Sequence, residues 1–393
     1  MRLLVVGGRL QGVEAVYLAK RAGYWVRVVD KAAPGPAMDL ADDFLQTDVT
    51  LPAALGRAAE GIDLILPALE NMDALRALTD GAPGLGIPLA FDLPAYEFSS
   101  SKLASDRRFA ENRIPAPDPW PACGYPVVVK PSEGSGSEGV RILADADARK
   151  KSFGDSFPPE GMVAQEHLEG PSYSVEVVGK PGAYQVLPAT ELEMDADHDC
   201  KRVRMPAGMS SELTARLEAV GRDCAEALNL TGIMDVEVIL HRGELKVLEV
   251  DARLPSQTPI TVYHGSGLNE VALLADLFVD GASQSQGAGA SSRGVVLEHI
   301  EVVGRHLTVR GEHIMGVDSP LRLVKHFFGA DEALATYAEG ADTWVATLII
   351  TGADQAAAWE KHERVMANLK EGFGLTTMED PTPERPRNQW GAP

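Results

Sequence analysis

Two short acidic segments constrain the fold of this chain more than any other feature of its sequence. Residues 232–237 read Gly-Ile-Met-Asp-Val-Glu, and residues 249–253 read Glu-Val-Asp-Ala-Arg. Successive side chains of a β-strand point to opposite faces, so the two carboxylates of each segment share one strand face. We predict that apolar side chains fill the opposite face of this hairpin: Met234, Val236, Val238, Leu248 and Val250.

The length of the turn between these strands decides whether all four carboxylates meet. A three-residue loop centred on Gly243 places Glu237 opposite Glu249 and Asp235 opposite Asp251, on one face. A two-residue loop puts the two pairs on opposite faces, so a shared acidic face requires the longer loop or a β-bulge. Like charges on one face are costly unless cations neutralise them, and hard divalent cations, Mg²⁺ first, prefer oxygen ligands. The alternative is a hairpin whose acidic face is solvated.

Composition narrows the class of protein. The 393 residues are enough for two or three domains, and a net charge of −21 argues against binding nucleic acid or anionic membranes. Three scattered cysteines show no disulfide or zinc spacing, which is typical of the reducing cytoplasm. The apolar start of the chain is too short for a signal peptide, and no apolar run is long enough to span a bilayer.

Strand and helix patterns alternate along the first ninety residues. Apolar strands are predicted at 3–6, 25–29, 63–66 and 88–91, with a helix at 13–22, which indicates a parallel sheet covered on both faces. We predict an α/β fold that becomes α+β in its central and C-terminal parts. The predicted divisions are a Rossmann-like domain at 1–92, a central subdomain at 93–170, a C-terminal domain at 171–377 and a proline-rich disordered tail at 378–393.

The rest of the chain gives further elements. The serines at 99–101 can cap a helix at 102–112. A segment rich in glycine, alanine, serine and glutamine at 281–294 is predicted to be a flexible loop. The other predicted strands are 126–130, 140–143, 162–168 and 173–178, and the other predicted helices are 214–228 and 269–279.

Two segments contain residues that could bind a nucleotide, one its phosphates and the other its adenine. Lys130 ends a strand and precedes a glycine- and serine-rich loop at 132–139, whose backbone N–H groups can hold phosphate oxygens, although the Gly-Lys-Ser/Thr ending of a P-loop is missing. Lys102 offers a second cation. The backbone of residues 165–169 can read an adenine edge. The alternatives are a plain hairpin loop, a solvated lysine and a polar edge strand.

The first glycine turn points away from a dinucleotide. Residues 7–12 read Gly-Gly-Arg-Leu-Gln-Gly, and Arg9 stands where a dinucleotide turn has its middle glycine. Asp30 lies where a ribose-binding acid would be. The sequence therefore disfavours a nicotinamide dehydrogenase, although open α/β sheets bind small molecules at this end of their strands.

Taken in order, these motifs resemble the ATP-grasp superfamily of carboxylate–amine ligases. Residues 7–15, 232–237 and 248–259 are similar to those of the ligases of pyrrolysine biosynthesis, and Leu-Pro-Ser-Gln-Thr-Pro at 254–259 separates this branch from most others. The resemblance runs to about residue 279 and more weakly to about 374. It implies an ATP-grasp fold behind a Rossmann-like pre-ATP-grasp domain.

The resemblance also implies an activity and its cofactors. These ligases join the carboxylate of (3R)-3-methyl-D-ornithine to the ε-amine of L-lysine through an acyl phosphate, giving 3-methyl-D-ornithyl-N6-L-lysine, ADP and phosphate. Glu237, Glu249 and Asp251 would hold two Mg²⁺ ions, which Mn²⁺ can replace. Many ATP-grasp ligases carry Asn at the position of Asp251. The ATP-binding residues would be Lys102, Lys130, Ser135, Gly136, Ser137, Glu166, His167, Leu168 and Glu169.

By the same resemblance, catalysis would involve Lys130 with Asp235, which binds the donor ammonium, and Arg253, which holds the donor carboxylate. Pro171 departs from the wider ATP-grasp pattern, where an acidic residue often follows the glycine and binds the ribose, so Glu169 is the expected substitute. The ornithine-type pocket would contain Ser174, Glu176, Asp235, Arg253, Ser256, Gln257 and Thr258. The lysine pocket would contain Leu10, Gln11 and Glu70. A second nucleotide pocket would contain Arg9, Asp30, Asp48 and Val49.

Other interpretations stay open at this point. Another ATP-grasp amino-acid ligase, such as a D-alanine–D-alanine ligase, would share the metal and phosphate residues, and a non-catalytic nucleotide-binding protein would share the first domain. The base that deprotonates the lysine amine is not identified by sequence: His299 is a candidate, with a core histidine as the alternative. The sequence leaves the exact donor methylation and the oligomeric state undetermined.

Overall fold

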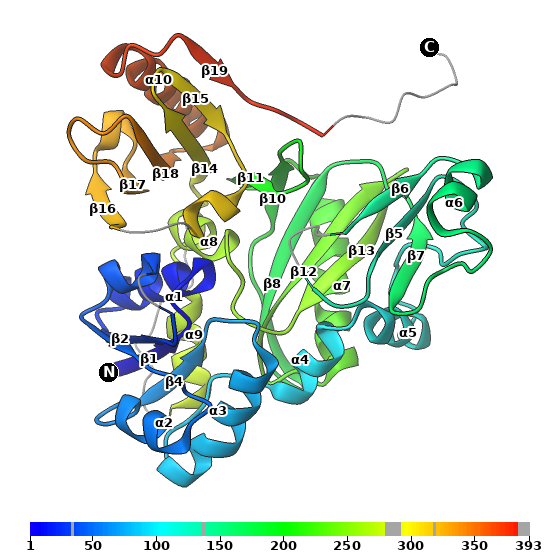
Figure 1. The fold of residues 1–393 in the computed structure, drawn as a ribbon, viewed down its shortest axis with the longest axis horizontal. Helices are drawn as coiled ribbons and strands as arrows, with labels where there is room; N and C mark the ends of the chain where they lie inside the picture. Colours follow the sequence, from blue (N-terminus) through cyan, green and yellow to red (C-terminus); the bar gives the residue numbers. More distant parts are fainter. Residues whose placement is uncertain (33–34, 135–138, 280–291, 317–319, 384–393) are drawn as a thin grey trace.

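A four-stranded parallel sheet forms from the first residues of the chain. We describe a computed structural model that covers residues 1–32, 35–134, 139–279, 292–316 and 320–383. The strand order is β3-β2-β1-β4, and the strands are parallel, as the apolar runs predicted (Figure 1). The strands are β1 (Arg2–Val6), β2 (Trp25–Asp30), β3 (Asp43–Gln46) and β4 (Leu64–Pro67).

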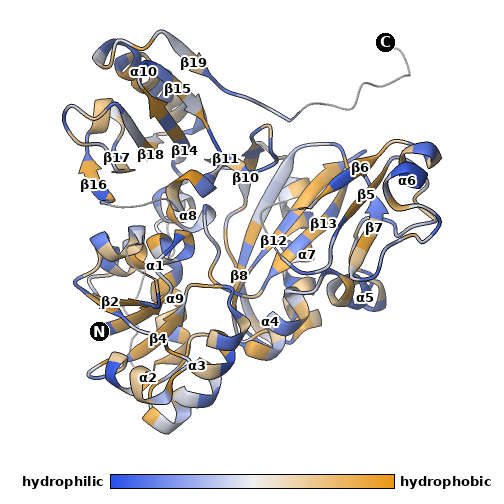
Figure 2. Ribbon diagram, in the orientation of Figure 1, coloured by the Kyte–Doolittle hydropathy of each residue, from blue (hydrophilic) through white to orange (hydrophobic). Residues whose placement is uncertain are grey.

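Both faces of this sheet are buried, because alternate side chains enter two different cores. Leu3 and Val5 pack in one core with helix α1 (Leu10–Arg21), whereas Leu4 and Val6 pack in another. Figure 2 shows these strands as largely hydrophobic. The second core is covered by helices α2 (Pro52–Ala58) and α3 (Met72–Leu85), and η1 (Pro36–Leu40) lies against α1.

Two details of this sheet differ from the sequence prediction. Residues 88–91 were predicted as a strand, but they make an isolated bridge between Leu89 and Ile65. β3 was not predicted, because it begins and ends with the polar residues Asp43 and Gln46 and has no apolar run. Pairing with β2 determines its conformation more than its own sequence does.

A small antiparallel sheet, in the order β6-β5-β7, follows in the chain. Helix α5 (Lys102–Asn112) begins where it was predicted, with the Ser101 hydroxyl accepting from the N–H of Ala104. The strands are β5 (Val127–Pro131), β6 (Arg141–Leu143) and β7 (Met162–Glu166), and the other helices are α4 (Leu93–Ser99) and α6 (Ala146–Phe153).

A third, much larger sheet carries the acidic hairpin at one edge. Its path is β13-β12-β8-β10-β11-β14-β18-β17-β16, with β9, β15 and β19 pairing outside this path (Figure 1). Its strands are β8 (Ser172–Lys180), β9 (Ala183–Val186), β10 (Thr190–Met194), β11 (Cys200–Met205), β12 (Gly232–His241), β13 (Glu244–Asp251), β14 (Gly294–Val303), β15 (His306–Val309), β16 (Arg322–Lys325), β17 (Glu332–Ala335), β18 (Thr343–Gly352) and β19 (Thr377–Glu379).

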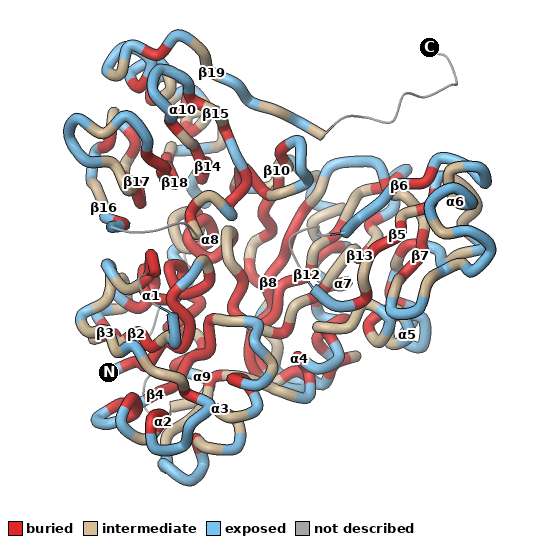
Figure 3. Tube along the Cα trace, in the orientation of Figure 1, coloured by how far each residue is buried: buried red, intermediate tan, exposed pale blue. Residues whose placement is uncertain are grey.

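Helices cover this sheet and connect it to the first one. Figure 3 shows that β8 is buried along most of its length. Helix α8 packs against α1 and β11, and α10 packs against β14 and β18. The elements are α7 (Ser211–Leu228), α8 (Thr258–Ser266), α9 (Glu270–Phe278), α10 (Gln355–Gly372), η2 (Glu312–Gly316) and η3 (Phe327–Gly329). None of the helices in the described residues is long and apolar enough to cross a membrane.

The hairpin uses a bulge rather than a three-residue loop. His241 pairs with Glu244 across a two-residue turn, and the register then shifts between Glu237 and Val238. Glu237 consequently lies opposite Glu249, and the shared acidic face is confirmed. The extra residue is Leu248.

The prediction that Leu248 joins the apolar face was therefore wrong. Val247 takes that place and is buried in the core with Val236 and Val238, whereas Leu248 lines a cavity.

The predicted tail is ordered where it begins. Residues 378–383 were assigned to it, yet Met378 and Glu379 belong to β19, which pairs in parallel with β15. Asp380 then forms ion pairs with Lys201 and Arg202 of β11. Residues 384–393 lie outside the described part of the chain, as does most of the predicted loop at 281–294.

We expect Asp380→Ala to lower the free energy of unfolding by about 2 kcal/mol, the value of one or two charge-assisted hydrogen bonds. Lys201 is 1% exposed, so its ammonium cannot regain water when the carboxylate is removed. Urea denaturation measures the change, and Glu379→Ala, at an exposed neighbour, is the control. Equal stability of the two variants would show that Asp380 contributes nothing.

Candidate functional site

A cavity of about 760 Å³ is lined by residues from all three sheets. The first sheet contributes residues that follow the carboxyl ends of its strands, where open α/β sheets bind ligands. The predicted site residues that line it are Arg9, Leu10, Gln11, Asp30, Glu70, Lys102, Lys130, Glu166, His167, Leu168, Asp235, Glu237, Glu249, Asp251, Arg253, Ser256 and Gln257. The structure thus brings together segments that lie far apart in the sequence.

The acidic hairpin face forms one wall of this cavity. Lys102 Nζ lies 2.6 Å from Glu249 Oε1 and donates to the carbonyl of Gly134 at 2.7 Å. Arg253 Nη2 lies 3.0 Å from Asp251 Oδ2. Each of these two hairpin carboxylates is therefore paired with a side-chain cation.

Burial and mutual repulsion make the hairpin carboxylates hard to ionise together. Burial, together with the neighbouring charges of Glu249 and Asp251, raises the pKa of Glu237 to about 8. Burial also raises the pKa of Asp235 and Asp251 well above the usual range, although Arg253 opposes both shifts. A face made of oxygen donors with excess negative charge suits a hard divalent cation, so Glu237, Glu249 and Asp251 fit Mg²⁺ chemically.

Lys130 stands beside the same wall and is buried. Burial lowers the pKa of its ammonium, while Glu249 acts in the opposite direction. The predicted loop residues Ser135, Gly136 and Ser137 lie outside the described residues, but Glu133 and Gly134 line the cavity. The two lysines and the start of this loop therefore border the hairpin, as the phosphate prediction requires.

The segment predicted to border adenine reaches the cavity only in part. Gln165, Glu166, His167 and Leu168 line it. Glu166 is held by an ion pair with Lys246 of β13.

Glu169, the predicted ribose contact, is exposed and does not line the cavity. Its backbone N–H donates to His241 Nδ1 at 2.9 Å. Glu169 therefore lies outside the cavity surface, and its contact with a ribose stays a prediction.

Arg253 connects the hairpin to the predicted lysine pocket. Its Nη2 lies 2.6 Å from Glu70 Oε1, the same oxygen that accepts from Gln11 Nε2 at 3.1 Å. Leu10 lines the cavity next to Gln11. One guanidinium thus links the acidic wall and the first sheet.

Three residues of the predicted ornithine pocket lie behind the cavity wall. Ser174, Glu176 and Thr258 are buried, and none of them lines the cavity. Glu176 pairs across the sheet with Asp235, and burial raises the pKa of Glu176 to about 7. These side chains can support the wall, but in this arrangement they do not form its surface.

The predicted second nucleotide pocket is divided in the same way. Arg9 and Asp30 line the cavity, but Asp48 and Val49 do not. Asp30 accepts from the N–H of Gly8 at 2.9 Å, and Asp48 accepts from the N–H of Thr50 at 3.0 Å. These two acids therefore stabilise local turns.

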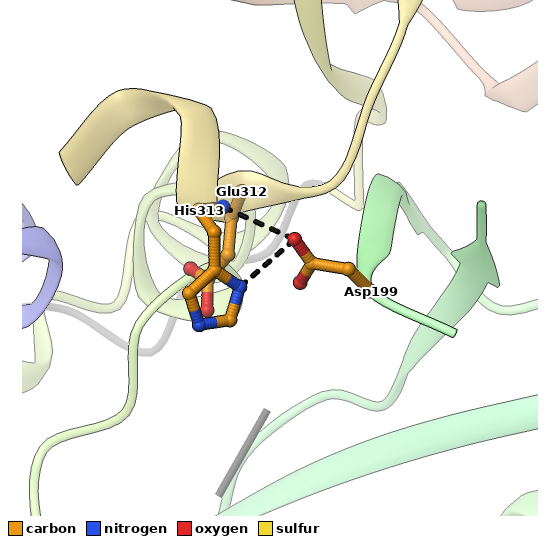
Figure 4. Close-up of side chains that lie close together, drawn as sticks. All are labelled: Asp199, Glu312 and His313. Carbon is orange, nitrogen blue, oxygen red and sulfur yellow. Dashed lines mark hydrogen bonds and ion pairs between the residues drawn. The ribbon is translucent and has the colours of Figure 1, made fainter. Parts of the chain in front are cut away.

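Sequence reasoning missed a cluster made of Asp199, Glu312 and His313. Figure 4 shows them facing one another across the space between η2 and the segment before β11, and His313 Nδ1 lies 2.8 Å from Asp199 Oδ2. In the described residues, this is the group of acids, cysteines or histidines whose ligand atoms all lie within 4.8 Å of one another. No local motif marks it, because its members come from two distant segments.

Glu312 contacts the predicted ornithine pocket. Its Oε1 accepts from Ser256 Oγ at 3.0 Å and from Gln257 Nε2 at 2.6 Å.

His299, the candidate base, is buried and does not line the cavity. Its Nδ1 forms a hydrogen bond with Thr347 Oγ1 at 2.9 Å. Burial lowers the pKa of His299 to about 4. The core interpretation of His299 is therefore confirmed.

Comparison with known proteins shows the fold class of this chain. The family model for the ATP-grasp domain matches residues 99–257. Among solved structures, N5-carboxyaminoimidazole ribonucleotide synthetase from Thermotoga maritima superposes with a TM-score of 0.64 at 20% identity, covering 93% of this chain and 98% of that one. The biotin carboxylase domain of Hydrogenobacter thermophilus 2-oxoglutarate carboxylase, in complex with MgADP, gives 0.69 at 15% identity, covering 93% and 89%. The fold is that of the ATP-grasp proteins.

Sequence similarity shows which family of ATP-grasp proteins the chain belongs to. The 3-methyl-D-ornithine–L-lysine ligase of Methanosarcina acetivorans is 33% identical over 374 residues, which are 95% of this chain and 98% of that one. The chain belongs to this family of ATP-grasp ligases.

We expect Glu14→Gln to stabilise the protein at pH 8 but not at pH 5. Glu14 is buried behind the cavity and accepts from the N–H of Ile260 at 3.0 Å, a bond that an amide oxygen keeps. Burial raises its pKa from 4.5 to about 8, so the folded state retains the proton longer than the unfolded state. Stability from this group is therefore present below about pH 4.5 and is lost as the pH rises towards 8.

The expected gain at pH 8 is on the order of 3 kcal/mol. Urea denaturation at the two pH values measures it, with Glu60→Gln at an exposed site as the control. A gain of the same size at both pH values would contradict the burial argument.

Proposed function

We propose that the protein is an ATP-dependent ligase that joins the carboxylate of (3R)-3-methyl-D-ornithine to the ε-amine of L-lysine, giving 3-methyl-D-ornithyl-N6-L-lysine, ADP and phosphate in pyrrolysine biosynthesis. One observation carries this proposal: Arg253 bridges Asp251 of the acidic wall and Glu70 of the first sheet. This arrangement puts a metal and phosphate region next to a region that suits charged amino acids. The printed name of the Methanosarcina relative supports the choice of substrates.

The nucleotide side of the site holds ATP through cations and backbone groups. Lys102 and Lys130 contact the phosphates, as do Ser135, Gly136 and Ser137, and residues 166–168 border the adenine. Glu237, Glu249 and Asp251 hold two Mg²⁺ ions, which Mn²⁺ can replace. When bound, the ions offset the charge of the phosphates. The solved ATP-grasp neighbour in complex with MgADP supports this assignment.

The donor amino acid binds over the hairpin. Asp235 holds its ammonium group, and Arg253 holds its carboxylate and stabilises the charge that develops there. Ser256 and Gln257 complete the pocket surface. Thr258, Ser174 and Glu176 support this surface from behind.

The acceptor lysine binds on the side of the first sheet. Glu70 holds an ammonium group, and Leu10 and Gln11 line its pocket. A carboxylate is a poor electrophile, so ATP first converts the donor carboxylate to an acyl phosphate, which the ε-amine then attacks. The cavity excludes water that would otherwise hydrolyse this intermediate.

The remaining assignments extend this proposal. We place the enzyme in the cytoplasm, where the free cysteines Cys123, Cys200 and Cys224 stay reduced. Its partners are small molecules rather than nucleic acid or membranes, in keeping with its net charge of −21. A D-alanine–D-alanine-type ligase and a non-catalytic nucleotide-binding protein are the alternatives that the experiments below separate.

We expect incubation with ATP, Mg²⁺, L-lysine and 3-methyl-D-ornithine to give a product with the mass of the isopeptide and an equal amount of ADP. The matched comparison uses D-ornithine as the donor, and we expect the methylated donor to give more coupled product. Mass spectrometry and an ADP assay measure both. ADP without a coupled product would show that the enzyme uses another acceptor. No ATP consumption with any amino-acid pair would favour the non-catalytic nucleotide-binding protein.

We expect Glu249→Gln to abolish ADP formation while the fold stays intact, because the amide removes one negative charge from the metal-binding wall. Glu244→Gln is the matched control, since Glu244 is exposed at the turn of the same hairpin. Circular dichroism checks the fold of both variants. Wild-type turnover of Glu249→Gln would remove Glu249 from the metal site.

A further inference from the structure

The short helix η2, which carries Glu312, touches both predicted amino-acid pockets. The carboxylate of Glu312 is held by Ser256 and Gln257 of the proposed donor pocket, and Glu312 lines the cavity. At the other end of η2, which packs against α1, a Cβ atom at Gly316 would come within 3.9 Å of Leu10 of the proposed acceptor pocket. Glu312 therefore borders the proposed donor pocket on an element that reaches the proposed acceptor pocket.

Most other carboxylates that line the cavity in the described residues already have a role or a strong partner. Glu70 is paired with Arg253, Glu166 with Lys246, and Asp199 with His313. Asp30 holds the backbone of two turns. Asp235 and the three proposed metal ligands belong to the donor and metal sites, and Glu133 is exposed beside the phosphate loop. Glu312 is 6% exposed, and the hydrogen bonds that hold it come from neutral side chains.

We propose that Glu312 is the general base that takes a proton from the attacking ε-ammonium group of lysine. This inference rests on the proposed ligase function and adds the group that the sequence did not identify. It assigns Glu312 to the second half-reaction, and ATP use and acyl phosphate formation precede its action.

The step balances in atoms and charge. One proton passes from the ammonium nitrogen to the carboxylate of Glu312, which frees the nitrogen lone pair. The nitrogen then bonds to the acyl carbon, and the bond between that carbon and the phosphate oxygen breaks. The second proton of the nitrogen leaves with the phosphate, and Glu312 returns the first proton to solvent.

The surroundings of Glu312 suit this role. Burial and the charge of Asp199 raise the pKa of Glu312 to about 7, although the bonds from Gln257 and Ser256 and the charge of His313 act in the opposite direction. A base whose pKa is near the working pH accepts and releases protons efficiently. His313 is a poor alternative, because its bond to Asp199 raises its pKa to about 9 and keeps it protonated. The titratable groups that interact with Glu312 are Glu14 on α1, Asp199 before β11, Cys200 on β11, Glu237 on β12 and His313 on η2.

The test compares two acceptors in the same enzyme. Wild type, Glu312→Gln and Glu312→Asp are incubated with ATP, Mg²⁺ and the ornithine-type donor, together with either L-lysine or hydroxylamine. Hydroxylamine is already a neutral nucleophile at pH 7, so it traps an acyl phosphate as a hydroxamate without a base. Glu301→Gln, in a surface pair with Arg310, is the matched control and should behave as wild type.

We expect Glu312→Gln to couple lysine ~100-fold more slowly or worse, while its hydroxamate formation stays within about threefold of wild type. Glu312→Asp should recover part of the lysine coupling. In wild type, coupling should fall below about pH 7 as Glu312 becomes protonated. In Glu312→Gln that fall should disappear, leaving only the increase with pH that comes from free amine.

Two results would overturn the assignment. Unchanged lysine coupling in Glu312→Gln would place the base elsewhere, and an equal loss with both acceptors would give Glu312 a structural or donor-binding role. Failure of the ligase proposal itself is recognisable separately, because wild type would then form neither the coupled product nor the hydroxamate.

Discussion

Repulsion among four carboxylates on one face of a hairpin is the constraint on which the rest of this structure depends. The face exists because a bulge at Leu248 shifts the register and sets Glu237 opposite Glu249. Burial increases the repulsion, since a carboxylate loses solvation as it enters the protein. Neighbouring side-chain cations offset this repulsion: Lys102 pairs with Glu249, and Arg253 pairs with Asp251.

The charged groups around the hairpin come from different parts of the chain. The small sheet and its neighbouring helix bring Lys130 and Lys102, and Arg253 follows the last hairpin strand. Glu70, which follows β4 of the first sheet, is linked to the hairpin through the guanidinium of Arg253. Solved structures at 15–20% identity share the fold, so the fold tolerates large changes of sequence. The family similarity, by contrast, extends over almost the whole chain.

Features that depend on neighbouring residues could be predicted from the sequence. The alternation of Asp235 and Glu237 fixed their common face, the serines at 99–101 marked the start of a helix, and apolar runs indicated the parallel sheet. Features that depend on distant pairing could not. β3 has no apolar run of its own and forms by pairing with β2. No neighbouring residue marks Leu248 as the bulge residue. β19 forms by pairing with β15, and Asp380, which follows it, bonds to Lys201. Glu312 was missed for the same reason, because its partners Ser256 and Gln257 lie far away in the chain.

The double pairing of Arg253 surrounds a single positive charge with two acids. Asp251 and Glu70 both bond to its Nη2 atom, and its Nε atom has no hydrogen-bond partner among the described residues, so an incoming carboxylate can bind the same guanidinium as a third anion. A simple anion would then face two acids that share one counterion, which is costly. A zwitterion brings a positive group with its negative one, and a divalent cation can neutralise an acid of the wall. The resting ion pairs therefore select for ligands that carry both charges, before any shape of the pocket is considered.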